Sequence, residues 1–191
     1  MLIQAAQFLL ETLFGLFVLA ALLRFFLQLM RAPYRNPFSQ FIAALTDFAV
    51  KPLRRIIPGL FGLDLASLTL AWLVEFILLL ALFWLSGMFQ LMAGPSLFLA
   101  IAFLAAVKLL KISIYIVLGA VFIQAILSWV SPHSPLAPVL NSLTTPFLRP
   151  VRKIIPPLAN VDLSPLVVLL VCELLLMVPI AWLESLAMRL T

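Results

Sequence analysis

Four long apolar runs, separated by segments rich in proline, glycine and charge, form the main pattern of this chain. The runs lie at about residues 8–30, 65–85, 108–130 and 163–183. A helix rises about 1.5 Å per residue, so roughly 20 residues cross a hydrocarbon core of about 30 Å. The pattern therefore predicts an all-α membrane protein with four transmembrane helices.

The third apolar run is longer than one span needs. It continues without a break from 97 to 130, which would be roughly 50 Å as a single helix. We expect residues 108–130 to cross the membrane. Residues 97–106 then form either an extra turn or two outside it or a tilted extension. Gly94-Pro95, just before this run, predicts a break after the second span.

The two polar connections also show helical periodicity. Apolar residues recur at helical spacing in the first connection, as Phe38, Phe41, Ile42, Leu45 and Ala49. The second connection repeats the spacing with Leu136, Val139, Leu140, Leu143 and Phe147. Asn36-Pro37 supplies a cap and a first-turn proline. Each stretch predicts a short amphipathic helix that either lies in the headgroup plane or folds back against the spans.

One eight-residue segment occurs twice in the chain. Residues 51–58 read Lys-Pro-Leu-Arg-Arg-Ile-Ile-Pro, and at an offset of 98 residues 149–156 read Arg-Pro-Val-Arg-Lys-Ile-Ile-Pro. An aspartate follows each copy six residues later. This predicts a tandem duplication, divided into residues 1–95 and 96–191. Each repeat holds two spans, so both have the same orientation, unlike the inverted repeats of many transporters.

The prolines of this segment also predict its local shape. Pro52 and Pro58, like Pro150 and Pro156 in the second copy, disfavour helix in the residue that precedes each of them. We therefore expect the basic pair of each copy to lie on a bent, extended exit from the amphipathic helix.

Composition excludes a soluble domain. The chain is 65% hydrophobic and 10% charged, whereas soluble domains are about half apolar and about a quarter charged. The net charge of +5 comes from basic residues in the two proline-rich connections. The positive-inside rule then predicts cytoplasmic connections and both termini outside. We expect no nucleic-acid partner, because no aromatic stacking residues or helical basic stripe accompany the basic pairs.

The basic segments and the aspartates that follow them form the first candidate site. Its residues are Lys51, Arg54, Arg55, Asp64, Arg149, Arg152, Lys153 and Asp162. The basic residues either set the topology alone or also dock a protein partner or anionic lipid. Each aspartate precedes a span, where it can accept hydrogen bonds from free helix amides and pair with an arginine of its own connection.

Ionisable residues inside the spans form the second candidate site. Glu75 and Glu173 each lie ten residues into a span, about 15 Å deep. Such carboxylates either hold helices together or serve a function. Arg24 lies at a similar depth and is the expected partner of Glu75. Its counterpart in the second repeat is an apolar residue, Phe122, so we expect Glu173 to pair with Gln124.

Catalytic chemistry has little support in the sequence. The chain has one histidine, His133, and one cysteine, Cys172, with no metal-ligand spacing, nucleophile motif or phosphate loop. We therefore expect neither an enzyme nor a bound cofactor or metal ion.

The second copy carries a family resemblance. It reads Leu-Thr-Thr-Pro-Phe-Leu-Arg-Pro-Val-Arg-Lys-Ile-Ile-Pro-Pro over residues 143–157, followed by Asp-Leu-Ser-Pro over residues 162–165. This pattern closely resembles the YggT family of small integral membrane proteins. The first copy is more divergent, with Phe48, Gly59 and Ala66-Ser67 at positions where the motif has proline, proline and Ser-Pro. Together the two copies cover nearly the whole chain.

The resemblance implies an inner-membrane protein associated with osmotic or extracytoplasmic stress. It also suggests partners connected with cell division or cytochrome assembly, and it supplies no catalytic residues. Two hypotheses follow. The first is a non-enzymatic scaffold or assembly factor whose duplicated connections dock a protein partner or anionic lipid. The second is an ion or small-solute conduit lined by Glu75 and Glu173, which would need a homo-oligomer because four spans are few for a pore.

Overall fold

The computed structural model describes residues 1–59, 62–87, 95–131, 133–155 and 162–190, and over these residues it contains helices and no strand. The elements are α1 (Leu2–Leu29), α2 (Pro37–Ile56), α3 (Leu65–Leu85), α5 (Pro95–Val130), α6 (Ala137–Ile154), α7 (Ser164–Leu175), the π-helical turn η1 (Leu176–Ile180) and α8 (Ala181–Leu190). The prediction of an all-α protein is confirmed.

Four of the described helices are long and apolar enough to cross a membrane. They cover Leu2–Leu29, Leu65–Leu85, Leu97–Val130 and Ser164–Arg189, which confirms a multi-pass membrane protein. The first begins six residues earlier than expected and the fourth ends six residues later. The division between residues 95 and 96 stays a prediction, because residues 88–94, with Gly94, lie outside the described ranges.

Helix α5 is the central element of the bundle. Its 36 residues form one continuous helix, about 54 Å long, so residues 97–106 are a continuation of the span and not a separate helix. Leu97, Ile101 and Leu104 are buried there against Leu79 of α3 and Ala187 of α8. Burial of this apolar face explains why the helix extends beyond the length of one span.

The fourth span contains a local change of helix type. η1 separates α7 from α8 and includes Pro179. Proline has no N–H to donate and its ring clashes with the carbonyl four residues earlier, and one wider turn relieves both problems. The chain crosses as one span with a π-helical turn within it.

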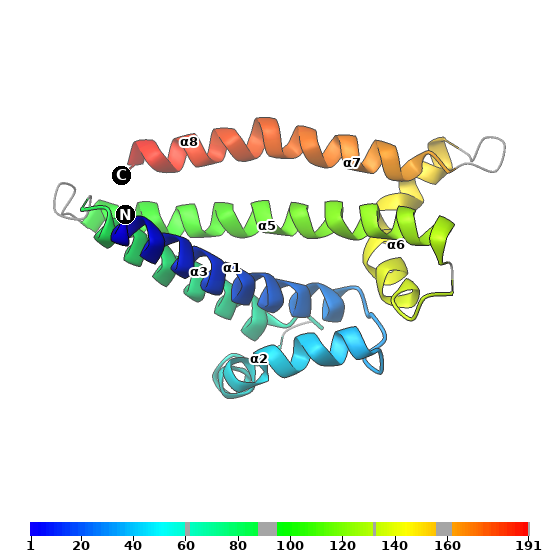
Figure 1. Cartoon of the computed structure of the whole chain (residues 1–191), viewed down its shortest axis with the longest axis horizontal. Helices are drawn as coiled ribbons and strands as arrows, with labels where there is room; N and C mark the ends of the chain where they lie inside the picture. Colours follow the sequence, from blue (N-terminus) through cyan, green and yellow to red (C-terminus); the bar gives the residue numbers. More distant parts are fainter. Residues whose placement is uncertain (60–61, 88–94, 132, 156–161, 191) are drawn as a thin grey trace.

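The helices run in a repeated up-and-down order. Figure 1 shows α1 and α5 running in one direction, α3 and α7–α8 returning, and both termini at the same end. We call the opposite end, where α1 and α5 finish, the loop end. Helices α1 and α3 slant away from α5 toward the loop end in this view. α5 packs against α3 on the first repeat and against α7 and α8 on the second.

The two repeats also meet at the loop end. Leu27 of α1 and Ile42 of α2 belong to one buried apolar cluster with Val139, Leu140 and Leu143 of α6. The side-chain amide of Asn36 donates a hydrogen bond to the backbone carbonyl of Pro135. Both amphipathic helices fold back onto the spans, α2 against α1 and α3, and α6 against α5 and α7. Packing against the spans, one of the two expected placements, is therefore observed for both helices.

The start of α2 is as predicted, and its apolar face is only partly buried. The Asn36 side chain accepts a hydrogen bond from the Phe38 amide at 2.9 Å, and Pro37 occupies the first turn. The buried residues of α2 are Ser39, Ile42, Ala43, Thr46 and Val50. The predicted apolar face is only partly buried, because Ile42 is buried whereas Phe41 and Leu45 are exposed. In α6 the predicted residues Val139, Leu140 and Leu143 are buried.

The prediction of an extended exit that carries the basic pair is wrong. α2 continues through Pro52 to Ile56, and α6 continues through Pro146 and Pro150 to Ile154. The basic pairs occupy the last helical turn in both. A proline late in a helix removes one hydrogen bond, and packing of the buried neighbour Val50 offsets that loss. Pro156 lies outside the described residues.

Candidate functional site

Asp64 is the buried centre of the first basic segment. Its side chain is 1% exposed and receives two bonds from the guanidinium of Arg54, from Nε at 3.2 Å and from Nη2 at 2.5 Å. It also accepts hydrogen bonds from the Ser67 amide at 3.3 Å and from the Ser67 hydroxyl at 2.5 Å. The predicted helix-start hydrogen bond and ion pair are both present. Together they tie the end of α2 to the start of α3.

A second set of charges links α1 to α2. The Nη1 atom of Arg24 lies 2.8 Å from Asp47 and donates to the Thr46 hydroxyl at 2.8 Å. Its Nε atom lies 3.8 Å from Asp64. Lys51 also pairs with Asp47, at 2.7 Å. Arg24 therefore contacts both carboxylates, Asp47 and Asp64. Because it also donates a hydrogen bond to Thr46, the polar side of α2 faces α1.

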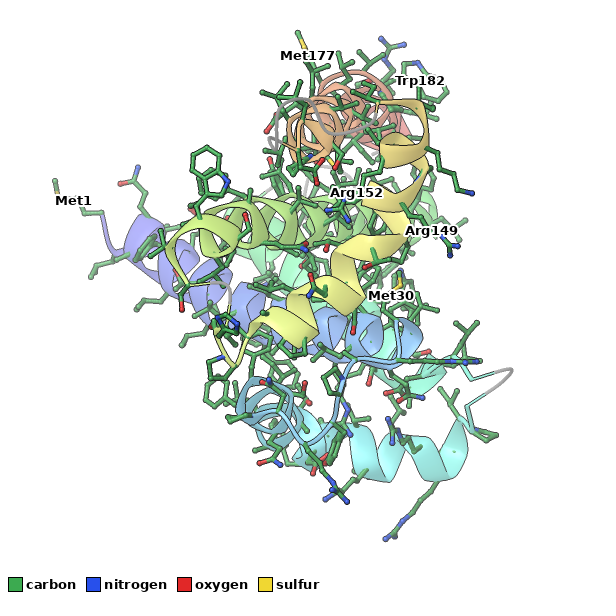
Figure 2. The ribbon with its side chains drawn as sticks, turned by 90° about the vertical axis from the view of Figure 1, so that its right-hand side faces the viewer. Met1, Met30, Arg149, Arg152, Met177 and Trp182 are labelled. Atoms are coloured by element: carbon green, nitrogen blue, oxygen red, sulfur yellow. The ribbon has the colours of Figure 1, made fainter. Side chains whose placement is uncertain are left out.

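The second repeat keeps the aspartate–arginine pair. Arg152 approaches Asp162 through Nε at 2.9 Å and Nη2 at 2.8 Å, and Ser164 donates to Asp162 through its amide and its hydroxyl. Figure 2 faces the loop end and shows Arg149 and Arg152 together on α6. This pair is more open, because the Asp162 side chain is 34% exposed. Both copies therefore keep the aspartate, its arginine and a serine cap, but Arg54 contacts both oxygens of Asp64 whereas Arg152 contacts one oxygen of Asp162.

The second repeat replaces the Arg24–Asp47 pair by neutral groups. The counterparts of Arg24 and Asp47 are Phe122 and Thr145. Instead, the hydroxyl of the buried Thr144 donates a hydrogen bond to the side-chain oxygen of Gln124. The side-chain amide of Gln124 donates a hydrogen bond to Asn141. A cation and an anion are lost together, so the internal charge balance is preserved. The same contact between span and amphipathic helix is ionic in the first repeat and neutral in the second.

The pKa values of the aspartates follow from these contacts. Burial alone would raise the pKa of Asp64, but the hydrogen bonds from Arg54 and Ser67 outweigh it, and its pKa lies below the ordinary value. The same balance lowers the pKa of Asp162, through Ser164 and Arg152. For Asp47 the hydrogen bond from Lys51 is the main cause of a lowered pKa. All three carboxylates are therefore held ionised at neutral pH.

The basic residues of the segment divide into two kinds. One arginine of each pair, Arg54 or Arg152, turns inward to an aspartate. The other member, Arg55 or Lys153, is exposed, and no described carboxylate pairs with either. The neighbouring Ile56 and Ile154 are 78% and 80% exposed. The inward arginines hold the helix ends in place, and the outward residues form two similar basic and apolar tips.

The predicted partner of Glu75 is wrong. Glu75 is buried and pairs with Lys108 of α5, whose Nζ atom lies 3.5 Å from Oε1. Arg24 pairs with Asp47 and Asp64 instead. Lys108 lies on α5, which packs directly against α3, and this packing brings the two side chains together. Glu75 and Lys108 thus form an ion pair between the repeats.

The predicted pairing of Glu173 with Gln124 is also wrong. Gln124 bonds to Thr144 and Asn141, because α6 folds back onto α5 beside it. Glu173 is exposed on α7. It lines a shallow cleft of about 410 Å³ with Tyr115 and the Lys111–Glu184 ion pair. The two intramembrane glutamates therefore have different surroundings, one buried and paired, one on the outer surface.

Sequence reasoning missed several members of the ionic network. Asp47, Thr46 and Gln28 were not singled out, although Gln28 accepts a bond from Arg54 at 2.9 Å. One available signal was the Leu-Thr pair that precedes both basic segments, since Thr46 and Thr144 are the buried threonines at the contact. Among the described residues no three histidine, cysteine or acidic side chains gather in a group that could hold a metal ion.

Comparison with known proteins places this architecture in a family. The CCB3/YggT family model matches residues 3–85 and 103–183. An uncharacterized protein of Pseudomonas aeruginosa is 42% identical over 190 residues, and the alignment covers 90% of this chain and 86% of that protein. The uncharacterized protein YggT of Escherichia coli is 35% identical over 165 residues, covering 85% of this chain and 82% of its own.

A protein of Vibrio alginolyticus is 38% identical over 166 residues, covering 86% of this chain and 87% of its own. No solved structure matches the chain. The two matched segments of the family model coincide with the two helix pairs and include both aspartate–arginine pairs. The chain therefore belongs to the CCB3/YggT family.

Proposed function

We propose that this protein is a non-enzymatic membrane scaffold whose two exposed basic tips dock a protein partner. The tips are Arg55-Ile56 and Lys153-Ile154. The observation that carries the proposal is the exposure of a cation and a large isoleucine at the same place in both repeats. The inward arginines hold these residues in place at the ends of α2 and α6. Such a tip suits an acidic protein surface with an apolar pocket.

Charge reversal at the tips tests the docking. Arg55→Glu and Lys153→Glu should each reduce recovery of the partner with the tagged protein, and the double variant should abolish it. Arg35→Glu is the matched control, because Arg35 is exposed and lies outside both tips. Membrane insertion is measured in parallel for each variant. If recovery is the same for all variants, the tips do not dock a protein. If the variants lose only binding to anionic vesicles, the tips contact lipid instead.

The cellular setting belongs to the same proposal. We infer a bacterial inner-membrane protein with the loop end in the cytoplasm and both termini outside, because the basic residues gather at the loop end. The resemblance supports a role in osmotic or extracytoplasmic stress, with partners from cell division or cytochrome assembly. A deletion strain that grows normally in high salt, or external labelling of a cysteine placed at Arg55, would contradict this setting.

The conduit hypothesis has one supporting observation. Glu173 and the Lys111–Glu184 pair face outward from α5 and α7–α8, where ionisable groups in a bilayer need a covering partner. A second copy would supply one and form the expected homo-oligomer. If so, Glu173→Gln should change ion flux in reconstituted vesicles. Flux equal to that of empty vesicles for wild type and variant would exclude the conduit.

A further inference from the structure

We propose that the cleft between the end of α1 and α2 binds a phosphate group, supplied either by an anionic phospholipid headgroup or by free phosphate. The cleft has a volume of about 550 Å³ and lies in the first repeat. Four cationic side chains line it, Arg24, Arg31, Lys51 and Arg54, with Asp47 as the carboxylate among them. This site uses residues other than the exposed tips, so it does not rest on the proposed docking.

The cleft has a positive charge that its own carboxylates do not balance. Lys51 and Arg24 share Asp47, and Arg54 and Arg24 share Asp64. Four cations facing two carboxylates leave an excess of two positive charges. Arg31 pairs with no described carboxylate. Because its backbone is in the left-handed region, at φ 52°, the chain turns sharply at the point where Arg31 reaches the cleft lining.

A buried hydroxyl in the same cleft has no partner. Ser39 is 5% exposed and lines the cleft. Its Oγ atom is the only buried side-chain nitrogen or oxygen that has no hydrogen-bond partner among the described residues. A buried donor without an acceptor is unfavourable and rare in folded proteins. An oxygen atom bound in the cleft would accept this hydrogen bond.

Phosphate fits this combination better than a single carboxylate. It offers several acceptor oxygens and up to two negative charges, and both arginine and lysine bind it with charge-assisted hydrogen bonds. Arg31, Lys51 and the Ser39 hydroxyl supply donors that the internal ion pairs do not use fully. Apolar residues beside them, Leu27 and Ile42, would suit the first methylene groups of the lipid acyl chains.

The second repeat lacks this site and so supplies the control. The counterparts of Arg24, Arg31 and Ser39 at the offset of 98 are Phe122, Trp129 and Ala137. Arg149, the counterpart of Lys51, is exposed and does not line the cleft of the first repeat. Removing a charge there changes the net charge of the protein as much as removing Arg31 does, without touching the cleft.

The experiment uses the purified full chain in neutral detergent, with wild type, Ser39→Ala, Arg31→Gln and the control Arg149→Gln. Inorganic phosphate is titrated by calorimetry. Retention of phosphatidylglycerol against phosphatidylcholine, whose choline cancels the phosphate charge, is measured by native mass spectrometry. Loss of one hydrogen bond to a charged group should weaken binding about tenfold in Ser39→Ala. Without any phosphate source, Ser39→Ala should melt no lower than wild type, because it removes an unsatisfied buried group.

The outcomes separate the two sources and test the site. Phosphatidylglycerol retention that falls in Ser39→Ala and Arg31→Gln, but not in Arg149→Gln, supports a lipid headgroup. The same pattern with inorganic phosphate supports free phosphate. The proposal is overturned if neither probe binds, or if both cleft variants bind as the wild type does. Partner recovery through the tips is measured separately, so the failure of one proposal does not affect the other.

Discussion

The guanidinium of Arg54 holds Asp64 through two nitrogen atoms, Nε at 3.2 Å and Nη2 at 2.5 Å. The residues are ten positions apart in the chain, and the pair closes the connection from α2 into α3. Arg152 and Asp162 repeat it in the second half. Both pairs therefore join the last turn of an amphipathic helix, which carries the neighbouring basic residue, to the start of the next span.

The first prediction compares these two pairs. Arg54→Gln should lower the free energy of unfolding by about 3 kcal/mol, because it leaves the buried carboxylate with the Ser67 hydrogen bonds and, of its two arginines, only the more distant Arg24. Arg152→Gln should cost less than about 1 kcal/mol, because Asp162 is partly exposed to solvent. Unfolding in mixed micelles by titration with a denaturing detergent measures both. Equal costs would show that burial of the aspartate does not decide its contribution.

The second prediction concerns the loss of stability at low pH. The pKa of Asp64 is lowered in the folded chain by Arg54 and Ser67 despite burial, so the stabilisation is present above the ordinary aspartate pKa of about 3.9. It is lost as the pH falls below that value and through the lowered folded pKa. Melting temperatures in micelles should be steady above about pH 5 and drop below about pH 4. Asp64→Asn should have a lower melting temperature at neutral pH and a flatter profile in acid.

The third prediction concerns the ionic contact between α1 and α2. Arg24→Phe and Asp47→Thr introduce the residues that the second repeat carries at the same places. Each single change leaves a charge with fewer partners, so the double variant should be more stable than the sum of the single losses predicts. We expect a coupling free energy of about 1–2 kcal/mol from a double-mutant cycle. Additive losses would mean that the Arg24–Asp47 pair contributes no coupling.

The fourth prediction concerns the ion pair between the repeats. Lys108→Met leaves Glu75 buried without its partner, whereas Glu75→Gln leaves a lysine that is 34% exposed and whose long side chain can extend toward the membrane surface. Lys108→Met should therefore be the more destabilising change, by about 3 kcal/mol. The exchange Glu75→Lys with Lys108→Glu should recover part of the loss. Melting of the three variants in micelles checks this order, and the reverse order would contradict it.

Sequence reasoning predicted the spans, the helix caps and both aspartate–arginine pairs, because these depend on local spacing. It failed where a contact depends on how helices are placed around one another. Matching Arg24 to Glu75 by depth said nothing about which side of the bundle each faces, and α2 and α5 supplied nearer partners. The apolar periodicity of α2 predicted the helix. Arg24 donates hydrogen bonds to the Thr46 hydroxyl and the Ala43 carbonyl, so this side of α2 faces α1 and Phe41 is exposed.

The central claim is that the two tips present a docking surface that their inward arginines hold in place. The most direct measurement is photo-crosslinking in cells from a reactive residue placed at Ile56, and separately at Ile154, with and without Arg55→Glu or Lys153→Glu. We predict the same discrete protein adduct from both positions, lost on charge reversal while the protein inserts normally. No adduct from either position, or one that charge reversal leaves unchanged, would contradict the account.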